Sequence, residues 1–428
     1  MARKMKDSGI EWIGEIPEGW EVVKAKYLFA QRNEKGNSAL VLLSPTQKYG
    51  VIPQSQLEGV VQVKENTDLR AFKTIHIGDF VISLRSFQGG FEFSNYEGVC
   101  SPAYQVFHAT KDLSNDFFRY LFKSDGFISK INSLTVGIRE GKNIQYWDFS
   151  NMLLALPPKK FQIRSAQYLN AKCTEIDTML SKTRSSIEEY KKLKQAVITQ
   201  AVTKGVRGER EMKDSGVEWI GEIPKEWAVS PMKHFIDILP GYAFSSDDFC
   251  IEDGIPLLRG INVGVNEIRW DETVRWNHSI SKQLESFFLK ENDLVVGLDR
   301  PWISDGTRVA FIAKKDLPCL LLQRVCRIRT RCNFDMRWIY YWLSGSSFKD
   351  SLSTETTGIS VPHISTKQIE QFIVAFPNQL EQTQICNYLD AKCAEIDKLI
   401  VKKEQLVKEL ESYKKSLIYE VVTGKREV

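Results

Sequence analysis

A heptad repeat of mostly apolar residues occurs twice in this chain and limits its possible folds more than any other feature. The first copy runs from residue 169 to residue 201, and the second begins 220 residues later, at residue 389. Two interleaved series with a spacing of seven form the a/d seam of a supercoiling helix, so the sequence predicts two long helices that can pair. The seam positions are Leu169, Cys173, Ile176, Leu180, Thr183, Ile187, Tyr190, Lys194, Val197 and Ala201 in the first copy, and Leu389, Cys393, Ile396, Ile400, Lys403, Val407, Leu410, Lys414, Leu417 and Val421 in the second.

The connection between the two helices favours an antiparallel pair. If the helices were parallel, the chain leaving Gly205 would have to run back along the whole first helix before the second domain could begin. An antiparallel pair needs only a short connector. With roughly 40 residues at about 1.5 Å each, the first helix would be on the order of 60 Å long. We therefore expect the helices to hold two domains apart.

A second repeat precedes each domain. Residues 5–22 and 212–229 are identical at fourteen of eighteen positions, and each copy is rich in glycine and proline and carries two tryptophans. We call these two segments the straps. Tryptophan needs an apolar environment, so a strap either packs on its own domain as a structural element or forms a docking surface for another subunit. The docking alternative would use Trp12, Trp20, Trp219 and Trp227.

The regions between the repeated elements predict α+β domains. Residues 39–44, 80–84 and 103–107 have the composition of strands, and residues 115–131 have the apolar spacing of a helix. The second region repeats this plan with a different sequence, as expected for domains that recognise different targets on a common scaffold. The expected boundaries are 1–22 for the first strap, 23–156 for the first domain, 157–205 for the first helix, 206–229 for a linker and the second strap, 230–375 for the second domain and 376–428 for the second helix.

Composition and missing motifs exclude several classes of protein. The chain has no run of eighteen apolar residues and no apolar leader segment, so we expect a cytoplasmic protein without a membrane span. Its eight cysteines lack CxxC spacing, which argues against a zinc site, and we expect no bound metal. Neither a phosphate-binding GxxxxGK[ST] loop nor a GxGxxG motif after a strand is present. We therefore predict no catalytic residues and no cofactor.

Several short sequence motifs resemble the specificity subunit of type I restriction-modification systems. Both straps contain Trp-Ile-Gly-Glu-Ile-Pro, and each strap is followed by a divergent α+β region and then a repeated helix. The likeness covers nearly the whole chain. The residues similar to that family's passage from a recognition domain into its conserved helix are Gly358, Ile359, Val361, Pro362, His363, Ile364, Ser365, Phe376, Pro377, Glu381, Gln382, Tyr388, Leu389 and Asp390.

The first half of the chain departs from that pattern. It keeps Gln162, but Phe161 stands where the second half has Glu381, and Asn170 stands where the second half has Asp390. These differences affect the detailed subunit contacts expected of the first helix.

The resemblance implies both an architecture and a function. It implies two globular α+β target-recognition domains separated by two long antiparallel coiled-coil helices, with an internal pseudo-two-fold repeat. A member of this family would bind double-stranded DNA and read a bipartite target, with one domain for each half-site. It would also hold two methyltransferase subunits and ATP-dependent restriction subunits, without catalysing a reaction itself. The main alternative is a coiled-coil scaffold that binds only proteins, and an enzyme with an unrecognised site is a third.

Two pairs of loops are candidates for DNA contact. Residues 84–90 and 298–302 follow equivalent strands, and residues 137–143 and 357–363 precede equivalent helices. Arginine and glutamine can each form paired hydrogen bonds with a purine edge, while glycine lets the backbone approach phosphate closely. Ordinary exposed turns are the alternative. The predicted DNA-contacting residues are Arg85, Ser86, Gln88, Arg139, Lys142 and Asn143 in the first domain, and Arg259, Arg300, Ser360 and His363 in the second.

Two further groups of residues allow more than one interpretation. Arg327, Arg329 and Arg331 alternate along an expected strand near Arg324, which predicts either a phosphate-binding face or a solvated strand face. Exposed lysines on the two long helices are expected to be mostly surface charge, although some could face the DNA between the half-sites. For contacts with other subunits, the candidates are the four strap tryptophans and the seam residues Leu180, Ile187, Ile400 and Val407.

Overall fold

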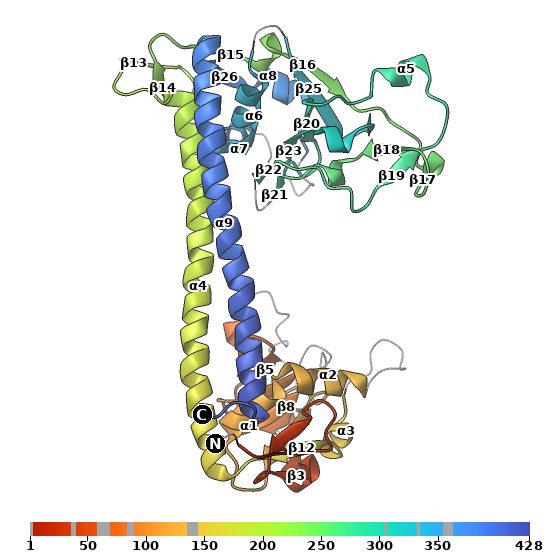
Figure 1. Cartoon of the computed structure of the whole chain (residues 1–428), viewed down its shortest axis with the longest axis vertical. Coiled ribbons are helices and arrows are strands. Elements are labelled where there is room, and N and C mark those ends of the chain that lie inside the picture. Colours follow the sequence, from red (N-terminus) through yellow and green to blue (C-terminus); the bar gives the residue numbers. More distant parts are fainter. Residues whose placement is uncertain are drawn as a thin grey trace. The chain divides into compact units, whose positions relative to one another are not determined.

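The computed structural model of the 428-residue chain describes residues 3–35, 40–57, 69–83, 90–134, 144–303, 306–331, 334–353 and 363–428. These residues form two units (Figure 1). Unit 1 comprises residues 1–183 and 405–428, and unit 2 comprises residues 184–404. The division falls within the two long helices, so each unit contains one sheet domain and part of both helices.

Each unit is built around a four-stranded antiparallel sheet, and the two sheets have the same plan. The strand order is first, last, second and third along the chain in both units, so the internal repeat predicted from the sequence is also a repeat of topology. In unit 1 the sheet consists of β4 (Phe29–Arg32), β11 (Gln105–Ala109), β8 (Phe80–Ile82) and β9 (Phe91–Phe93); in unit 2 it consists of β16 (Ile236–Pro240), β25 (Val325–Thr330), β20 (Leu294–Gly297) and β23 (Val309–Phe311).

The straps form equivalent β-hairpins. Each hairpin is followed by a strand that pairs with the last strand before a long helix, which ties the strap to the point where that helix begins. In unit 1 these strands are β1 (Met5–Asp7), β2 (Glu15–Pro17), β3 (Glu21–Lys24) and β12 (Leu153–Leu156); in unit 2 they are β13 (Met212–Asp214), β14 (Glu222–Pro224), β15 (Ala228–Pro231) and β26 (Ile373–Phe376).

The helix expected at residues 115–131 is two helices, α1 (Asn115–Phe122) and α2 (Asp125–Ser133). The break occurs because Ser124 adopts an extended backbone conformation, with φ −71° and ψ 141°, and its hydroxyl donates a hydrogen bond to the Leu121 carbonyl. In unit 2 the equivalent α6 (Met336–Ser344) and α7 (Ser346–Ser353) are separated by Gly345.

Two of the expected strands are confirmed with shifted ends. Residues 80–84 and 103–107 correspond to β8 and β11. The strand expected at 39–44 is only partly found, because residue 39 lies outside the described residues and β5 (Leu43–Thr46), which pairs with β6 (Gly50–Pro53), includes only its last two residues. The core of unit 1 is a phenylalanine cluster, and that of unit 2 contains two fully buried tryptophans on α6. The remaining strands and α-helix among the described residues of unit 1 are β7 (Lys73–Ile75), β10 (Gly98–Cys100) and α3 (Tyr146–Ser150).

Unit 2 carries a second sheet in addition to the shared one. This sheet mixes antiparallel and parallel pairing, and leucine and aromatic side chains on and beside it form a separate small core. Its strands are β17 (Phe249–Cys250), β19 (Val274–Trp276), β18 (Ile255–Leu258) and β24 (Leu320–Leu321). The other elements of unit 2 are α5 (Lys282–Glu285), α8 (Thr366–Gln371) and the hairpin of β21 (Trp302–Ile303) and β22 (Gly306–Thr307).

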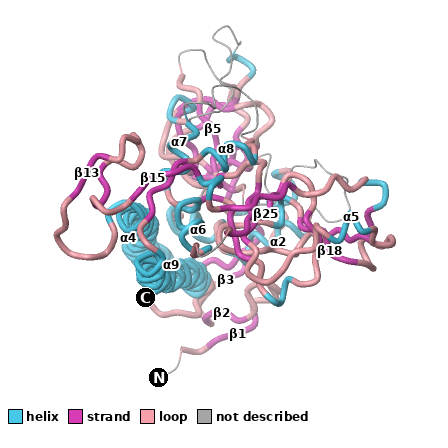
Figure 2. The backbone as a smooth tube through the Cα atoms, turned by 90° about the horizontal axis from the view of Figure 1, so that it is seen from above, coloured by secondary structure: helices cyan, strands magenta, loops and turns pink. Residues whose placement is uncertain are grey.

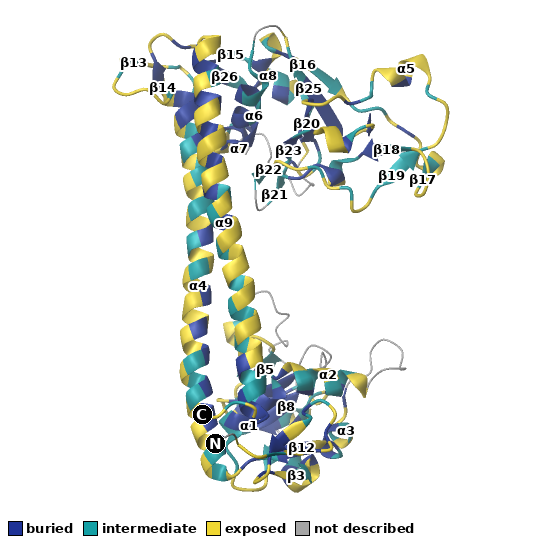
Figure 3. Cartoon of the chain, viewed as in Figure 1, coloured by how far each residue is buried: buried dark blue, intermediate teal, exposed yellow. Residues whose placement is uncertain are grey.

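The two long helices are α4 (Lys159–Lys204) and α9 (Gln379–Val422), and Figures 1 and 2 both show them side by side. Every predicted seam position is buried or half-buried, while exposed residues cover the outer faces (Figure 3). The heptad interpretation is therefore confirmed. No helix among the described residues is long and apolar enough to cross a membrane.

The repeated seam lysines fix the direction and the register of this helix pair. In unit 1 the Nζ of Lys414 lies 2.6 Å and 2.7 Å from the carboxylate oxygens of Asp177. In unit 2 the Nζ of Lys194 lies 2.7 Å from both carboxylate oxygens of Asp397. The two ion pairs are related by the same 220-residue offset as the sequence repeats, and their order along the chain is that of antiparallel helices. A lysine at a seam position that pairs with a carboxylate beside the seam favours one register over its alternatives.

A buried aspartate immediately precedes one of the two central strands of each sheet, β8 in unit 1 and β20 in unit 2. In unit 2, Asp293 is 3% exposed and accepts hydrogen bonds from Nε and Nη2 of Arg329 and from the backbone N–H of Lys290. In unit 1, Asp79 is held in the same way by Arg32 and by the backbone N–H of His76. The arginine comes from a different strand in each unit, so the two domains satisfy the same carboxylate by different routes.

We expect Asp293→Asn to destabilise unit 2 by about 1–3 kcal/mol, because the amide cannot accept both arginine bonds and leaves a partly buried guanidinium without its counter-charge. Thermal and denaturant unfolding of the full chain would measure this loss. The matched control is Glu395→Gln, which removes an exposed partner of Lys392 and should change stability by less than about 0.5 kcal/mol. Equal effects from the two substitutions would contradict a structural role for the buried aspartate.

Candidate functional site

The structure describes three of the ten predicted DNA-contacting residues, and all three lie in unit 2. They are Arg259, Arg300 and His363. The others lie outside the described residues, namely Arg85, Ser86, Gln88, Arg139, Lys142, Asn143 and Ser360. The candidate site is therefore built from unit 2 alone.

The two loops predicted in the second domain meet. Asp299, in the loop after β20, forms an isolated antiparallel bridge with His363, and the backbone N–H of Ile364 donates to the Leu298 carbonyl over 2.9 Å. The Nδ1 of His363 lies 2.6 Å from Oδ1 of Asp299. Residues more than sixty positions apart are thus joined at one surface, although the sequence predicted each loop separately.

Arg324 joins these loops and was not among the predicted contacts. Its Nη1 donates to Oδ2 of Asp299, and its backbone carbonyl accepts from the N–H of Leu298 over 2.9 Å. Burial opposes ionisation of Asp299, but the hydrogen bonds from Arg324 and His363 outweigh it and lower the pKa of that carboxyl. The carboxylate is therefore charged and shared between two side chains, one bound to each of its oxygens.

Arg308 connects a third turn to the same surface. This half-buried side chain donates from Nε to the Val263 carbonyl over 2.8 Å, from Nη1 to the Asp299 carbonyl over 3.2 Å and from Nη2 to the Gly260 carbonyl. It therefore holds the turn that begins at Arg259 against the loop that contains Arg300. Burial lowers the pKa of Arg308, and the positive charges of Arg269 and Arg300 lower it further.

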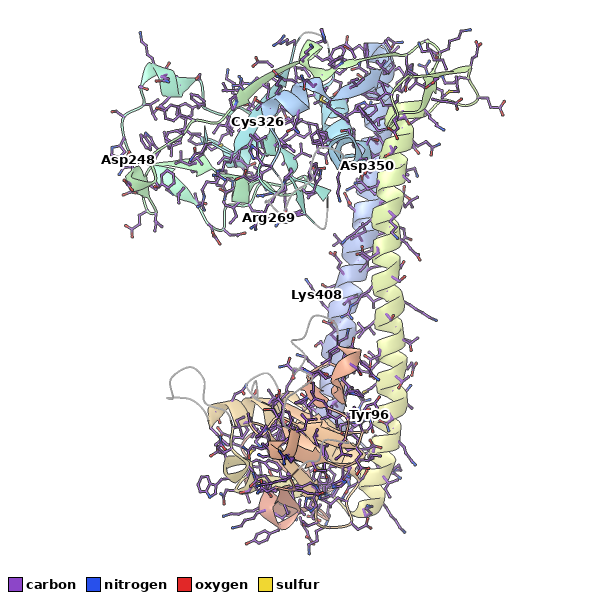
Figure 4. All side chains as sticks on the ribbon, turned by 180° about the vertical axis from the view of Figure 1, so that it is seen from behind. Tyr96, Asp248, Arg269, Cys326, Asp350 and Lys408 are labelled. Atoms are coloured by element: carbon purple, nitrogen blue, oxygen red, sulfur yellow. The ribbon has the colours of Figure 1, made fainter. Side chains whose placement is uncertain are left out.

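Five arginines gather on these loops, and we call them the arginine surface. Arg269 pairs with Glu267 and Arg324 pairs with Asp299, whereas Arg308 is held by backbone carbonyls. Among the described residues, Arg259 and Arg300 have no carboxylate partner. Arg300 is also exposed, with a left-handed backbone at φ 44°. Figure 4 shows the side chain of Arg269 at the surface of unit 2. The arginine surface thus carries unpaired positive charge, as a polyanion-binding surface requires. Its members are Arg259, Arg269, Arg300, Arg308 and Arg324.

The alternating arginines of β25 do not form the phosphate-binding or solvated face considered above. Arg327 is 6% exposed and its Nη2 lies 3.1 Å from Oδ2 of Asp237, while Arg329 binds the buried Asp293. Both arginines form ion pairs within unit 2, because β25 lies between β16, which carries Asp237, and β20, which follows Asp293. Arg331, beyond the end of the strand, is exposed.

The strap tryptophans divide into two kinds. Trp20 and Trp227 are each 1% exposed and pack edge-on against Phe161 and Trp338 of their own units. They leave no surface for another subunit, which corrects the docking prediction for these two residues. Trp12 and Trp219 are only half-buried and stay candidates for subunit contact.

The predicted interface residues on the helix seam require a similar correction. Leu180, Ile187 and Ile400 are buried, and Val407 is half-buried on the face that α4 and α9 share. In unit 1, Leu180 and Val407 belong to one hydrophobic cluster. These side chains pack within the chain, so a separate subunit would have to contact other faces of the helices.

The departures in the first half of the chain have local explanations. Phe161 packs on Trp20, whereas the equivalent Glu381 is buried and binds Nη1 of Arg210 over 2.7 Å. Asn170 accepts hydrogen bonds from Arg119 and Tyr120, as Asp390 does from Arg337 and Tyr341 in unit 2. The differing residues therefore support the same junctions with different partners.

Comparisons with known proteins show which family this chain resembles. A family model described as the type I restriction modification DNA specificity domain matches residues 224–409. The chain is 26% identical over 420 residues to the type I restriction enzyme MjaVIII specificity subunit of Methanocaldococcus jannaschii, which covers 96% of this chain and 93% of that protein. Over residues 224–409 this chain matches the DNA specificity domain of that family, and over nearly its whole length it is similar to a type I specificity subunit.

Two solved structures have the same fold as this chain. A chain from a structure described as the basis of complex assembly and conformational transition of the type I R-M system covers 96% of this chain and 99% of its own, with a TM-score of 0.70 at 17% identity. The HsdS subunit from Thermoanaerobacter tengcongensis gives a TM-score of 0.52 at 17% identity, covering 96% of this chain and 98% of its own. All five residues of the arginine surface lie within the matched residues 224–409.

Proposed function

We propose that this chain is a type I specificity subunit that recognises a bipartite DNA sequence, with the sheet domain of each unit reading one half-site. The observation that carries the proposal is the repetition of strand order in two domains whose connecting loops differ. A shared frame with different loops suits two readers of different sequences, because base recognition depends on a few side chains in the grooves. The arginine surface supports DNA as the ligand of unit 2.

The paired helices would set the separation of the two half-sites. The antiparallel helices α4 and α9 are joined by a lysine–aspartate ion pair in each unit, and these pairs oppose sliding of one helix along the other. A helix pair of fixed register has a fixed length, so its length would determine the number of base pairs between the half-sites.

The proposal also includes assembly with two methyltransferase subunits and with restriction subunits. In unit 1 a groove of about 460 Å³ lies beside Trp12 and is lined by Leu134, Trp147 and Leu153. Trp147 is 73% exposed, an unusual position for so large an apolar side chain on a free surface. The groove and the half-buried Trp219 of unit 2 are where we would look for subunit contacts.

Selection from a random pool of DNA duplexes tests the proposal. The full chain with its methyltransferase subunits should enrich two short sequences separated by a constant gap. Enrichment of no sequence, together with stable binding of the methyltransferase, would favour the alternative of a scaffold that binds only proteins.

We expect Arg300→Ala to weaken binding to the selected duplex by about 1–3 kcal/mol if the side chain pairs with a base, with loss confined to the half-site read by unit 2. Competition binding against duplexes altered at single positions would measure this. An equal loss on every duplex would instead assign Arg300 to a phosphate. Arg331→Ala is the matched control, because Arg331 is exposed but lies beyond the opposite end of β25, roughly 20 Å along the chain from Arg324.

A further inference from the structure

We propose that Arg324 reads a guanine in the half-site recognised by unit 2, and that Asp299 is the residue that positions it. This inference rests on the proposed function and goes beyond it by naming the reading side chain, the base and the residue that orients the reader.

The backbone of Arg324 is fixed in an unusual conformation. Its φ is 67°, in the left-handed region that residues with a side chain seldom adopt. The conformation is held because the Arg324 carbonyl accepts from Leu298, while the N–H of the preceding Gln323 donates to the Tyr242 carbonyl over 2.9 Å. The turn thus projects an arginine from the end of β25 at a defined position.

The side chain of Arg324 is both exposed and oriented. It is 69% exposed, yet Nη1 donates to Oδ2 of Asp299. Among the described residues, Nε and Nη2 have no hydrogen-bond partner. A guanidinium has five N–H donors in a planar fork, so one bond to a carboxylate leaves enough donors for a bidentate contact. Guanine offers two acceptors, O6 and N7, on its major-groove edge, and the arginine fork matches that pair.

Asp299 is suited to a positioning role because it is itself held on several sides. Its Oδ1 accepts from His363, its backbone carbonyl accepts from Arg308, and its side chain is only 26% exposed. A carboxylate fixed in this way limits the rotamers of Arg324 before DNA arrives. That restriction lowers the conformational entropy lost on binding.

The same carboxylate favours a base over a phosphate as the ligand of Arg324. A phosphate beside Asp299 would experience repulsion from its negative charge, which offsets part of the attraction to the arginine. The edge of guanine is neutral and is not repelled in this way. This criterion does not distinguish a base from a phosphate for Arg300, which has no carboxylate partner among the described residues.

Binding measurements on the full chain with Arg324→Ala, Asp299→Asn and the double variant test this assignment. The duplexes would be the selected target, a set with each base pair of the unit 2 half-site replaced in turn, and an unrelated duplex. Arg324→Ala should bind the selected target about 10- to 100-fold more weakly and lose discrimination at one G·C pair, with unchanged binding to the unrelated duplex. Asp299→Asn should reduce discrimination at that same pair by a smaller factor.

The double variant separates positioning from an independent contribution. If Asp299 acts through Arg324, the double variant should bind like Arg324→Ala alone, whereas independent contributions would multiply. Arg324→Lys keeps the charge but not the fork, so it should recover binding without recovering discrimination. Thermal unfolding of each variant accounts for any loss of folded protein, which would lower the amount bound without altering the preference among bases.

Three results would overturn the inference. Equal weakening of Arg324→Ala on all duplexes would assign Arg324 to the DNA backbone. An unchanged base preference of that variant would show that its bond to Asp299 is only a surface ion pair. Losses that multiply in the double variant would exclude the positioning role of Asp299. Failure of the proposed function is distinguishable, since the unsubstituted chain would then select no bipartite sequence at all.

Discussion

Exchange of residues 23–156 for the equivalent region of a relative is expected to change one half of the DNA target completely and leave the other half unchanged. The reason is that each sheet has its own hydrophobic core, with no strand pairing between the units among the described residues. The exchanged region ends at β12, whose pairing with β3 would have to be preserved. Methylation mapping in cells that carry the chimera and its methyltransferase partner would reveal both half-sites and the gap.

The reciprocal exchange of residues 230–375 is the matched control and should change the other half only. A chimera that folds but alters both half-sites would contradict independent reading by the two domains. Conservation of both halves would show that the specificity is determined outside the exchanged residues.

One heptad added to each long helix is expected to lengthen the gap by about three base pairs. Insertions at Ser185 and at Gln405 preserve the seam, because seven residues complete one a/d repeat. They also leave the Lys414–Asp177 and Lys194–Asp397 pairs intact, since each pair lies within a single unit. Seven residues extend a helix by about 10 Å, and a base pair rises about 3.4 Å along DNA. Selection from a random duplex pool would measure the new gap, while both half-site sequences should stay the same.

The added base pairs also rotate one half-site around the duplex by about a quarter of a turn, so we expect weaker binding along with the longer gap. Insertion of four residues in each helix is the control, because it breaks the seam and should destabilise the helix pair. A folded double-heptad variant that still selected the original gap at full affinity would show that the helices do not set the spacing.

The sequence by itself determined the features that depend on local periodicity and on repetition. The a/d seam could be predicted because a spacing of seven is meaningful within one helix, and the repeated Lys194 and Lys414 mark the same place in each copy. The strap tryptophans could be located but not sorted into buried and half-buried residues. Similarly, Asp79 and Asp293 could be aligned, but the strands that supply their arginine partners could not be identified.

Only the tertiary structure decided which residues form the candidate site. Arg327 and Arg329 have the alternation of an exposed face, yet the pairing of β25 on both edges places them in ion pairs within the domain. Arg324, in the turn just before β25, contacts Asp299 because β20 and β25 are neighbours and their ends lie close together. Periodicity indicates which side of a strand a residue occupies. Contacts between distant residues depend instead on the order of strands in the sheet, and a single sequence does not encode that order as a local pattern.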